Sequence, residues 1–279
     1  LYRAAPDPEG LAEAARLLKA AKQPLVLLGG GCVSAPEAAR ALIEKLDTPT
    51  VTTINAKGLL GRDHPLDLGA NAALPAVREL AANADVILAV GTELGETDYD
   101  VVFDDGFHLN GTLIRIDLDP EQLVRNQRTT LGLVGDAGRS LALLLTHFSA
   151  PLKRQGAERT AAALDTLDLA NDPAFSDFVP LYATLADHLP EAILVGDSTA
   201  PVYAGNHLVS QPAPRRYFNA STGYGTLGYG LPAALGAQLA RPGLPVVALV
   251  GDGGVMFTLS EIATAVEAMR RGAVNYLCK

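Results

Sequence analysis

The chain has 279 residues, of which 48% are hydrophobic, and its 22 basic against 31 acidic side chains give a formal net charge of −9. The acidic balance argues against nucleic acid or an anionic membrane as the main partner, and the length favours two ordinary domains. With only Cys32 and Cys278 there is no disulfide framework, and the five histidines lack the spacing of zinc ligands. Because we find no signal peptide or spanning apolar stretch, we expect a cytoplasmic protein.

The first half of the chain alternates short apolar runs with amphipathic segments. Asp7 and Pro8 form a helix start, in which a capping side chain precedes a proline in the first turn. The alternation of strands and helices favours a parallel, doubly wound sheet, and we place this first domain at residues 1–150. The expected strands are 24–28, 50–54, 85–90, 112–117 and 131–134, and the expected helices are 8–22, 36–46, 75–82, one that starts at Pro120, and 139–147.

Residues 151–172 combine a proline, a charged run and a stretch without a clean period, so they predict an interdomain linker with some helix. The second domain is expected at 173–279. Its first strand is followed by Gly196, Asp197, Ser198 and Thr199. Such a turn suits a phosphate, although by itself it also fits an ordinary helix cap. The expected elements are helix 173–189, strand 192–195, a helix that ends near Arg241, and strand 245–250.

A glycine-rich stretch lies between residues 219 and 264. A loop with Gly223, Gly225, Gly228 and Gly230 leads into an Ala/Leu helix, and the apolar run 245–250 predicts a strand buried on both faces. That strand ends in Gly251, Asp252, Gly253 and Gly254. Ligands of open α/β sheets bind at the carboxyl ends of the strands, so a carboxylate among glycines there suits a metal and a phosphate. The Asp-Gly pair alone also fits a common turn.

The combination of these features resembles a known family. GDGG after an apolar strand, followed by TLSEIAT and preceded by GYGTLGYGLPAALGAQLA, resembles the diphosphate-binding domain of thiamin diphosphate enzymes, especially the acetolactate synthase group. Residues 1–150 resemble the central domain of the same enzymes through LGGGC, INAKGLLGRDHPLDLG, DVILAVGTELGETD, IRIDLDPEQ and VGDAG. The expected fold is therefore α/β with two doubly wound parallel-sheet domains: a Rossmann-like central domain and an incomplete thiamin diphosphate-binding domain.

The resemblance implies a 2-oxoacid decarboxylase or carboligase that uses thiamin diphosphate and Mg²⁺. Asp252 would be the metal ligand. Leu227 matches the apolar residue that wedges under the cofactor, and the Gly225 carbonyl matches the acceptor for its aminopyrimidine amine. We treat these last two as the catalytic positions. The implied cofactor-binding residues are Asp197, Ser198, Thr199, Gly225, Leu227, Gly251, Asp252, Gly253 and Gly254.

Two departures from the family pattern bear on activity. A second magnesium ligand, an Asn, is expected about 27 residues after the Asp, where this chain has Lys279; Asn275 is a candidate displaced remnant. Leu1 falls where an interdomain linker would be, so the domain with the activating glutamate is expected to be missing. We therefore expect a piece of a homo-oligomeric enzyme, dimer or tetramer, that is inactive alone. A non-catalytic nucleotide-binding or scaffold remnant is the alternative; a dinucleotide oxidoreductase ranks last, because Gly29-Gly30-Gly31 is not GxGxxG.

The central domain binds FAD in acetolactate synthases, and ADP or nothing in some relatives. Here TELGETD follows Gly91, where the FAD-binding pattern has an Arg-Phe-Asp-Asp-Arg run, and carboxylates would repel a pyrophosphate. FAD is therefore doubtful, and a purely structural domain is an equal alternative. The acidic run is either a solvated loop or the border of a channel for a cationic 2-oxoacid, as in 5-guanidino-2-oxopentanoate decarboxylases. Its members are Glu93, Glu96, Asp98, Asp100, Asp104 and Asp105.

Overall fold

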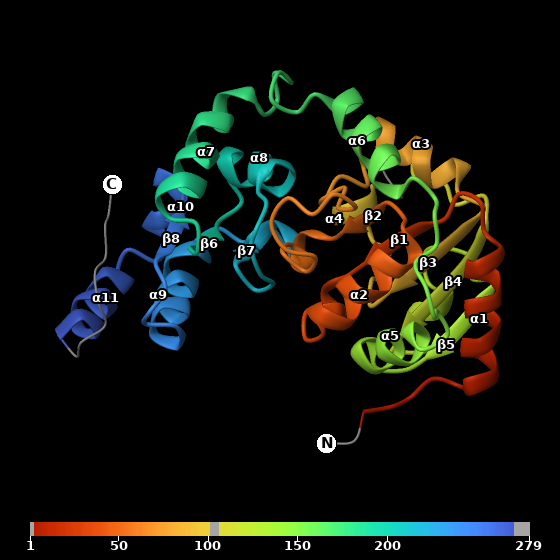
Figure 1. The fold of residues 1–279 in the computed structure, drawn as a ribbon. Coiled ribbons are helices and arrows are strands. Elements are labelled where there is room, and N and C mark those ends of the chain that lie inside the picture. The colour runs from red at the N-terminus through yellow and green to blue at the C-terminus, as the bar shows by residue number, and fades with distance from the viewer. Residues whose placement is uncertain (1–2, 101–105, 271–279) are drawn as a thin grey trace.

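The computed structural model describes residues 3–100 and 106–270, and it has two lobes joined by an arching connection (Figure 1). The first lobe contains a five-stranded sheet of order β2-β1-β3-β4-β5, and the second a three-stranded sheet of order β7-β6-β8. Every described strand pair is parallel. The predicted fold class, α/β with two parallel sheets, is confirmed.

The first lobe follows the predicted order of elements closely. Its first helix begins where expected, because the Asp7 carboxylate caps it by accepting the backbone N–H of Gly10 at 2.8 Å. The elements are α1 (Pro8–Ala20), β1 (Leu25–Leu28), η1 (Gly30–Cys32), α2 (Pro36–Leu46), β2 (Thr50–Thr52), η2 (Ile54–Ala56), α3 (Pro75–Asn83), β3 (Val86–Val90), α4 (Glu96–Tyr99), β4 (Thr112–Asp117), η3 (Gln122–Val124), β5 (Leu131–Val134) and α5 (Ala137–Leu145).

The helix expected from Pro120 is wrong. Only the short turn η3 forms there. Its one buried residue is Leu123, and Val124 is 81% exposed, so the segment lacks a continuous apolar face. The side chains of Asp117 and Asp119 accept backbone N–H groups two residues ahead, at 3.0 and 2.9 Å. Such local turns compete with a helix for the backbone donors.

The first sheet is buried on both faces. In β1, Val26 and Leu28 join one hydrophobic cluster together with α1, α2 and α5, whereas Leu25 and Leu27 join another together with α3. α6 (Gly156–Leu167) packs against this second cluster through Ala163. The segment 151–172 therefore contains a helix that packs on the first lobe, and the domain boundaries themselves stay a prediction.

The second lobe contains a strand that the sequence did not indicate. This is β7, a run of only three residues that pairs with β6, with Leu194 opposite Tyr217. The elements are η4 (Ser176–Phe178), α7 (Val179–His188), β6 (Ile193–Gly196), α8 (Ala200–Leu208), β7 (Tyr217–Asn219), η5 (Ala220–Thr222), α9 (Gly230–Ala240), β8 (Val246–Leu249), α10 (Asp252–Met256) and α11 (Glu261–Arg270).

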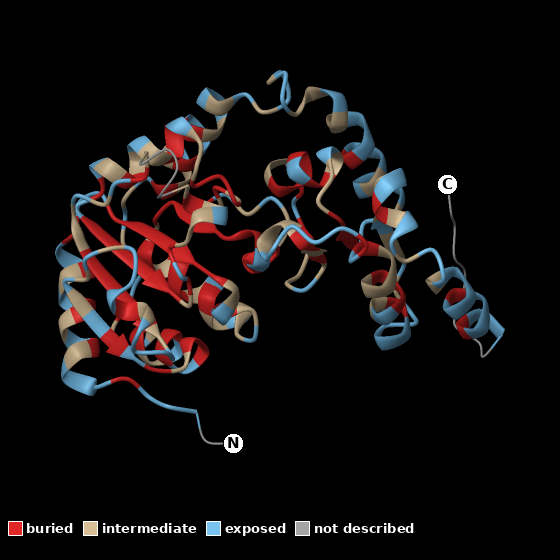
Figure 2. Cartoon of the chain, turned by 180° about the vertical axis from the view of Figure 1, so that it is seen from behind, coloured by how far each residue is buried: buried red, intermediate tan, exposed pale blue. Residues whose placement is uncertain are grey.

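The expectation that strand 245–250 is buried on both faces is wrong for this chain. Ala248 is exposed, and the other residues of β8 are only half-buried. Within residues 3–100 and 106–270, β8 pairs with β6 alone, so it is an edge strand. Figure 2 shows the same difference across the molecule: buried residues fill the sheet of the first lobe, while the helices around β8 carry much exposed surface.

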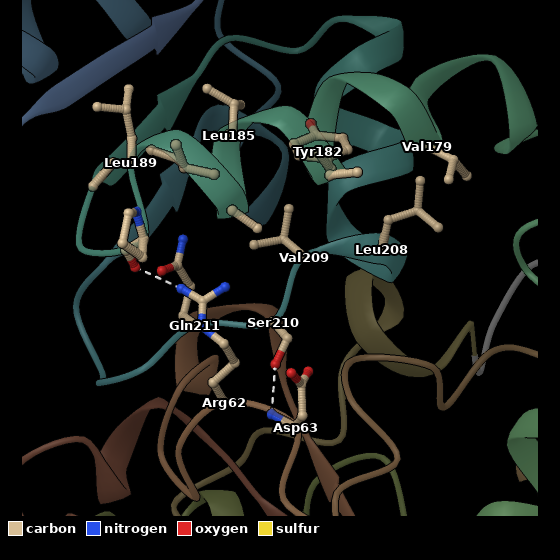
Figure 3. Close-up of a pocket in the computed structure, with 15 residues that line it drawn as sticks. Arg62, Asp63, Val179, Tyr182, Leu185, Leu189, Leu208, Val209, Ser210 and Gln211 are labelled. Atoms are coloured by element: carbon tan, nitrogen blue, oxygen red, sulfur yellow. Dashed lines mark hydrogen bonds between the residues drawn. The ribbon is translucent and has the colours of Figure 1, made fainter.

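The lobes also meet below the arching connection. Arg62 donates to the Pro190 carbonyl at 2.5 Å, and the Asp63 backbone N–H donates to Ser210 Oγ at 3.0 Å (Figure 3). Lys57 of the first lobe donates from Nζ to the Val209 carbonyl at 2.9 Å. The loop after β2 is therefore fastened to the segment that follows α8.

Candidate active site

The two turns that the sequence singled out lie at the same edge of the second sheet. β6 and β8 are parallel neighbours, with Gly196 opposite Leu249, so the residues that follow both strands leave the sheet together. Thr199 Oγ1 is 3.6 Å from the point that a Cβ on Gly251 would occupy. The structure thus brings turns 196–199 and 251–254 side by side at the carboxyl ends of the strands, which is where ligands of open α/β sheets bind.

Asp197 holds the glycine-rich loop. Its side chain is completely buried, Oδ2 accepts the backbone N–H of Gly228 at 3.0 Å, and Oδ1 accepts that of Gly230 at 2.5 Å. A Cβ on Gly254 would lie 2.4 Å from Oδ2, so only a glycine fits there without a shift. One carboxylate therefore joins three segments. It contacts the protein's own backbone, and the direct cofactor contact expected of Asp197 stays a prediction.

Ser198 offers a hydroxyl group that no described residue uses. Its Oγ is buried and has no hydrogen-bond partner among the described residues. It lies 3.4 Å from the point that a Cβ on Gly225 would occupy, which puts it against the glycine-rich loop. A buried polar group left unpaired costs about 1–3 kcal/mol, so such an atom indicates a missing partner. An oxygen-rich ligand beside Gly225 would supply it.

The glycine-rich loop has a backbone that requires glycine. Gly225 has φ +65° and Gly228 has φ +85°, a conformation in which a Cβ is strained. Thr258 Oγ1 also donates to the Gly228 carbonyl at 3.2 Å, so the loop is fastened from both sides. Between these glycines Leu227 is 46% exposed and therefore free to contact a bound molecule.

Asp252 stands open at the end of β8. It is exposed, and its Oδ1 accepts the backbone N–H of Gly253 at 2.8 Å. Apart from its chain neighbours and the backbone of its own helix, a Cβ built on Gly253 would meet no heavy atom of the described residues within 4 Å. Within the described part of the chain no group of three or more His, Cys, Asp or Glu side chains could hold a metal. A magnesium ion at Asp252 would therefore take its other ligands from carbonyl, phosphate or water oxygens, which Mg²⁺ accepts. Asn275 lies outside the described residues.

A second candidate region lies in the first lobe. A cavity of about 350 Å³ at the ends of β1 and β3 is lined by glycines, by Glu93, Glu96 and Asp98, and by Thr222 of the second lobe. Burial raises the pKa of Asp98, whose Oδ1 accepts the Ile54 N–H at 2.8 Å. Among the described residues that line this cavity there is no basic side chain. Its residues do not fit the pyrophosphate of FAD, whereas they do fit a cation.

Of the remaining members of the acidic run, Asp100 is described and does not line that cavity. Asp100 is paired with Arg78 at 2.9 Å. Asp104 and Asp105 lie outside the described residues.

A buried arginine that the sequence analysis missed holds this acidic segment. Arg115, 1% exposed in the middle of β4, donates to the carbonyls of Thr92 at 3.1 Å and Arg125 at 2.6 Å. Asn126 donates to the Glu93 carbonyl at 3.1 Å. The signal in the sequence was a charged residue inside an otherwise apolar strand, because a buried arginine needs specific acceptors.

Two family models match this chain. The model described as thiamine pyrophosphate enzyme, central domain, matches residues 11–144, and the model described as C-terminal TPP binding domain matches residues 196–274. The chain belongs to the thiamine pyrophosphate enzyme family. The two turns and the glycine-rich loop fall inside the second matched range. The cavity lined by Glu93, Glu96 and Asp98, called the acidic cavity below, is formed mainly by residues of the first matched range.

Named relatives belong to the same family. A protein named probable 2-ketoarginine decarboxylase from Pseudomonas aeruginosa is 38% identical over 96% of this chain and 48% of its own length. The large subunit of acetolactate synthase isozyme 1 from Escherichia coli is 32% identical over 93% of this chain and 46% of its own length. The chain spans about half the length of these relatives.

A solved structure agrees with the fold. It is described as a thiamin diphosphate-dependent enzyme from Mycobacterium smegmatis, with a TM-score of 0.75 and 27% identity, and it covers 95% of this chain and 52% of the other. No described helix has the length and apolar character that crossing a membrane requires.

Proposed function

We propose that the whole protein is a thiamin diphosphate- and Mg²⁺-dependent enzyme that decarboxylates a 2-oxoacid and passes the acyl unit to a proton or a second carbonyl. The observation that carries the proposal is the unpaired, buried Ser198 hydroxyl, which lies against Gly225. It stands beside an open carboxylate at the neighbouring strand end, and the chain's family supports a diphosphate there.

Each residue of the site has a proposed task. Ser198, Thr199 and the backbone N–H groups of Gly253 and Gly254 would hold the diphosphate. Asp252 would bind the metal. When bound, the cofactor supplies the electron sink for loss of CO₂. Asp197 keeps the loop in the shape that presents Leu227 and the Gly225 carbonyl to the cofactor's rings.

The finer proposal concerns the substrate. We infer that the 2-oxoacid carries a cationic side chain such as a guanidinium group. The cavity lined by Glu93, Glu96 and Asp98 reaches Thr222, which leads directly into the glycine-rich loop, so an elongated substrate would extend from one region to the other. A guanidinium group forms paired hydrogen bonds with carboxylates. A relative at 38% identity is named probable 2-ketoarginine decarboxylase, which supports this preference.

The test measures CO₂ release by the full-length protein with thiamin diphosphate and Mg²⁺. We expect a kcat/KM for 5-guanidino-2-oxopentanoate well above that for pyruvate. Equal values, or a preference for pyruvate, would end the finer proposal but leave the cofactor assignment intact. A full-length protein that binds no thiamin diphosphate would instead support the non-catalytic scaffold role.

The exposed apolar surface of the second lobe supports assembly. We propose that the full-length protein is a homo-oligomer, because large apolar side chains of α9, α10 and α11 and their connections are exposed in the part of the chain that the structure describes. These are Leu239, Met256, Phe257, Leu259, Ile262, Val266 and Met269. Sedimentation of the full-length protein as a monomer at micromolar concentration would contradict this.

A further inference from the structure

A second large cavity, of about 510 Å³, lies between the lobes and apart from the proposed active site. Three parts of the chain form its walls: the loop between β2 and α3, helix α6, and the segment from the end of α8 to Gln211. None of the residues assigned to the cofactor lines it. Any ligand here would contact both lobes.

Two side chains of opposite charge, the buried Lys57 and the half-buried Asp67, line this cavity without forming an ion pair. Lys57 is 4% exposed, and its Nζ donates to the Val209 carbonyl at 2.9 Å and lies 5.7 Å from the centre of the Tyr217 ring. Asp67 Oδ1 accepts hydrogen bonds from Thr52 Oγ1 at 3.1 Å and from the Gly69 N–H at 2.8 Å. Asp67 Oδ2 has no hydrogen-bond partner among the described residues.

Burial disfavours both charges: it lowers the pKa of Lys57 to about 8 and raises the pKa of Asp67. Buried charges are normally paired, because an unpaired one loses its hydration without compensation. Asp67 and Asp98 act on Lys57, and Lys57 and His64 act on Asp67, which offsets part of this cost although no ion pair forms between Lys57 and Asp67. One molecule with a negative and a positive group would compensate both charges directly.

A third group in the wall has no partner. Thr160 of α6 is 2% exposed, and its hydroxyl makes no hydrogen bond with any described residue. Thr166 on the same helix behaves as a helical threonine usually does and donates to the carbonyl four residues earlier, at 2.8 Å. The Thr160 hydroxyl is thus available to a molecule in the cavity.

Asp63 and His64 also line the cavity, and much of the rest of its lining is neutral or apolar. His207 Nδ1 lies 2.8 Å from Asn71 Oδ1, and burial lowers the pKa of His207 to about 4, so the ring is neutral near pH 7. Much of the remaining wall is aliphatic and includes Leu68, Leu164, Leu169 and Leu208. Such a wall suits a hydrocarbon side chain.

We propose that this interlobe cavity binds a small zwitterion, an α-amino acid with an apolar side chain. Its carboxylate lies toward Lys57, its ammonium group donates to Asp67 Oδ2, and Thr160 contributes a hydrogen bond. The site is separate from the proposed cofactor site, so it stands whether or not the decarboxylase proposal holds.

The test is calorimetric titration of the full-length protein with L-leucine and L-phenylalanine. Two analogues of leucine each lack one charge: 4-methylpentanoate has no ammonium group, and 3-methylbutylamine has no carboxylate. We expect saturable binding of at least one amino acid, and at least about tenfold weaker binding of both analogues. The absence of binding by both amino acids, or an analogue that binds as tightly as leucine, overturns the proposal.

Two variants on one helix localise the binding. Thr160→Val keeps the shape but removes the hydroxyl, and we expect it to weaken amino-acid binding about fivefold, the effect of one hydrogen bond. Thr166→Val, the matched control, leaves binding unchanged. Asp67→Asn removes the charge and is expected to weaken binding more than tenfold while 4-methylpentanoate is unaffected. If Thr160→Val and Asp67→Asn both bind leucine like the wild type, the ligand is elsewhere and the proposal is wrong.

Discussion

Asp197 Oδ1 accepts the backbone N–H of Gly230 at 2.5 Å, inside a completely buried environment. This bond ties the turn after β6 to the first residue of α9, which lies 33 positions further along the chain. The glycine-rich loop therefore owes its shape to a carboxylate in another turn. A cofactor that rests on this loop depends on Asp197 without needing to contact it.

Replacement of Asp197 tests that dependence. Asp197→Asn puts an amide –NH₂ group opposite backbone N–H donors, so at least one hydrogen bond is lost and the loop loosens. We expect a loss of about 1–3 kcal/mol in the free energy of unfolding and at least about tenfold weaker thiamin diphosphate binding by the full-length protein. Asp187→Asn is the control, since the Asp187 side chain is 82% exposed. If Asp197→Asn binds thiamin diphosphate as tightly as the wild type does, then cofactor binding does not depend on Asp197.

Gly254 tests the same contact from the other side. In Gly254→Ala the new Cβ would lie 2.4 Å from Asp197 Oδ2, so either the carboxylate or α10 must shift. We expect a loss of about 1–3 kcal/mol in the free energy of unfolding, measured with denaturant. Apart from its chain neighbours and its own helix backbone, the new Cβ of Gly253→Ala meets no described atom within 4 Å, so this variant should leave the free energy of unfolding unchanged or slightly raised. Equal stability of the two variants would contradict the described packing.

The acidic cavity makes a prediction about substrate choice. Glu93→Gln removes one negative charge from its lining while keeping the side-chain shape. In the full-length enzyme we expect the KM for a guanidino-2-oxoacid to rise about tenfold, with little change in the KM for pyruvate. Glu121→Gln, an exposed residue outside the cavity, should change neither KM. A uniform loss for both substrates in Glu93→Gln would indicate a structural role instead.

Lys57 makes stability depend on pH. Burial lowers the pKa of Lys57 from 10.5 to about 8, so between these values the unfolded chain holds the proton more firmly than the folded protein does. The contribution of Lys57 to the free energy of unfolding is therefore lowest below pH 8 and rises as the pH increases toward 10.5. From pH 7.5 to 9.5 we expect the wild type to gain about 2 kcal/mol relative to Lys57→Met. The exposed Lys22→Met is the control, and parallel pH profiles for wild type and Lys57→Met would refute the prediction.

Local patterns predicted most of the first lobe. Runs such as 86–90 are apolar throughout because both faces of the sheet are covered. Such a run can be recognised from the sequence alone. β7 was not predicted, since three residues give no recognisable period. The helix expected from Pro120 was wrong because the proline start signal was followed by the single buried residue Leu123 and not by a continuous apolar face.

The candidate site was predicted only in part. The sequence identified the turns at 196–199 and 251–254 as candidates, because glycine, acid and hydroxyl residues after a strand are a local signal. It could not reveal that Asp197 accepts hydrogen bonds from Gly228 and Gly230, which depends on how distant segments meet. The unpaired hydroxyls of Ser198 and Thr160 are likewise visible only in three dimensions.

The most direct test of the central claim is calorimetric titration of the full-length protein with thiamin diphosphate, with and without Mg²⁺, for the wild type and Asp252→Ala. The account predicts saturable, Mg²⁺-dependent binding by the wild type and its loss in Asp252→Ala, with both proteins equally folded. Binding that is indifferent to Mg²⁺ and to the removal of the Asp252 carboxylate would contradict it.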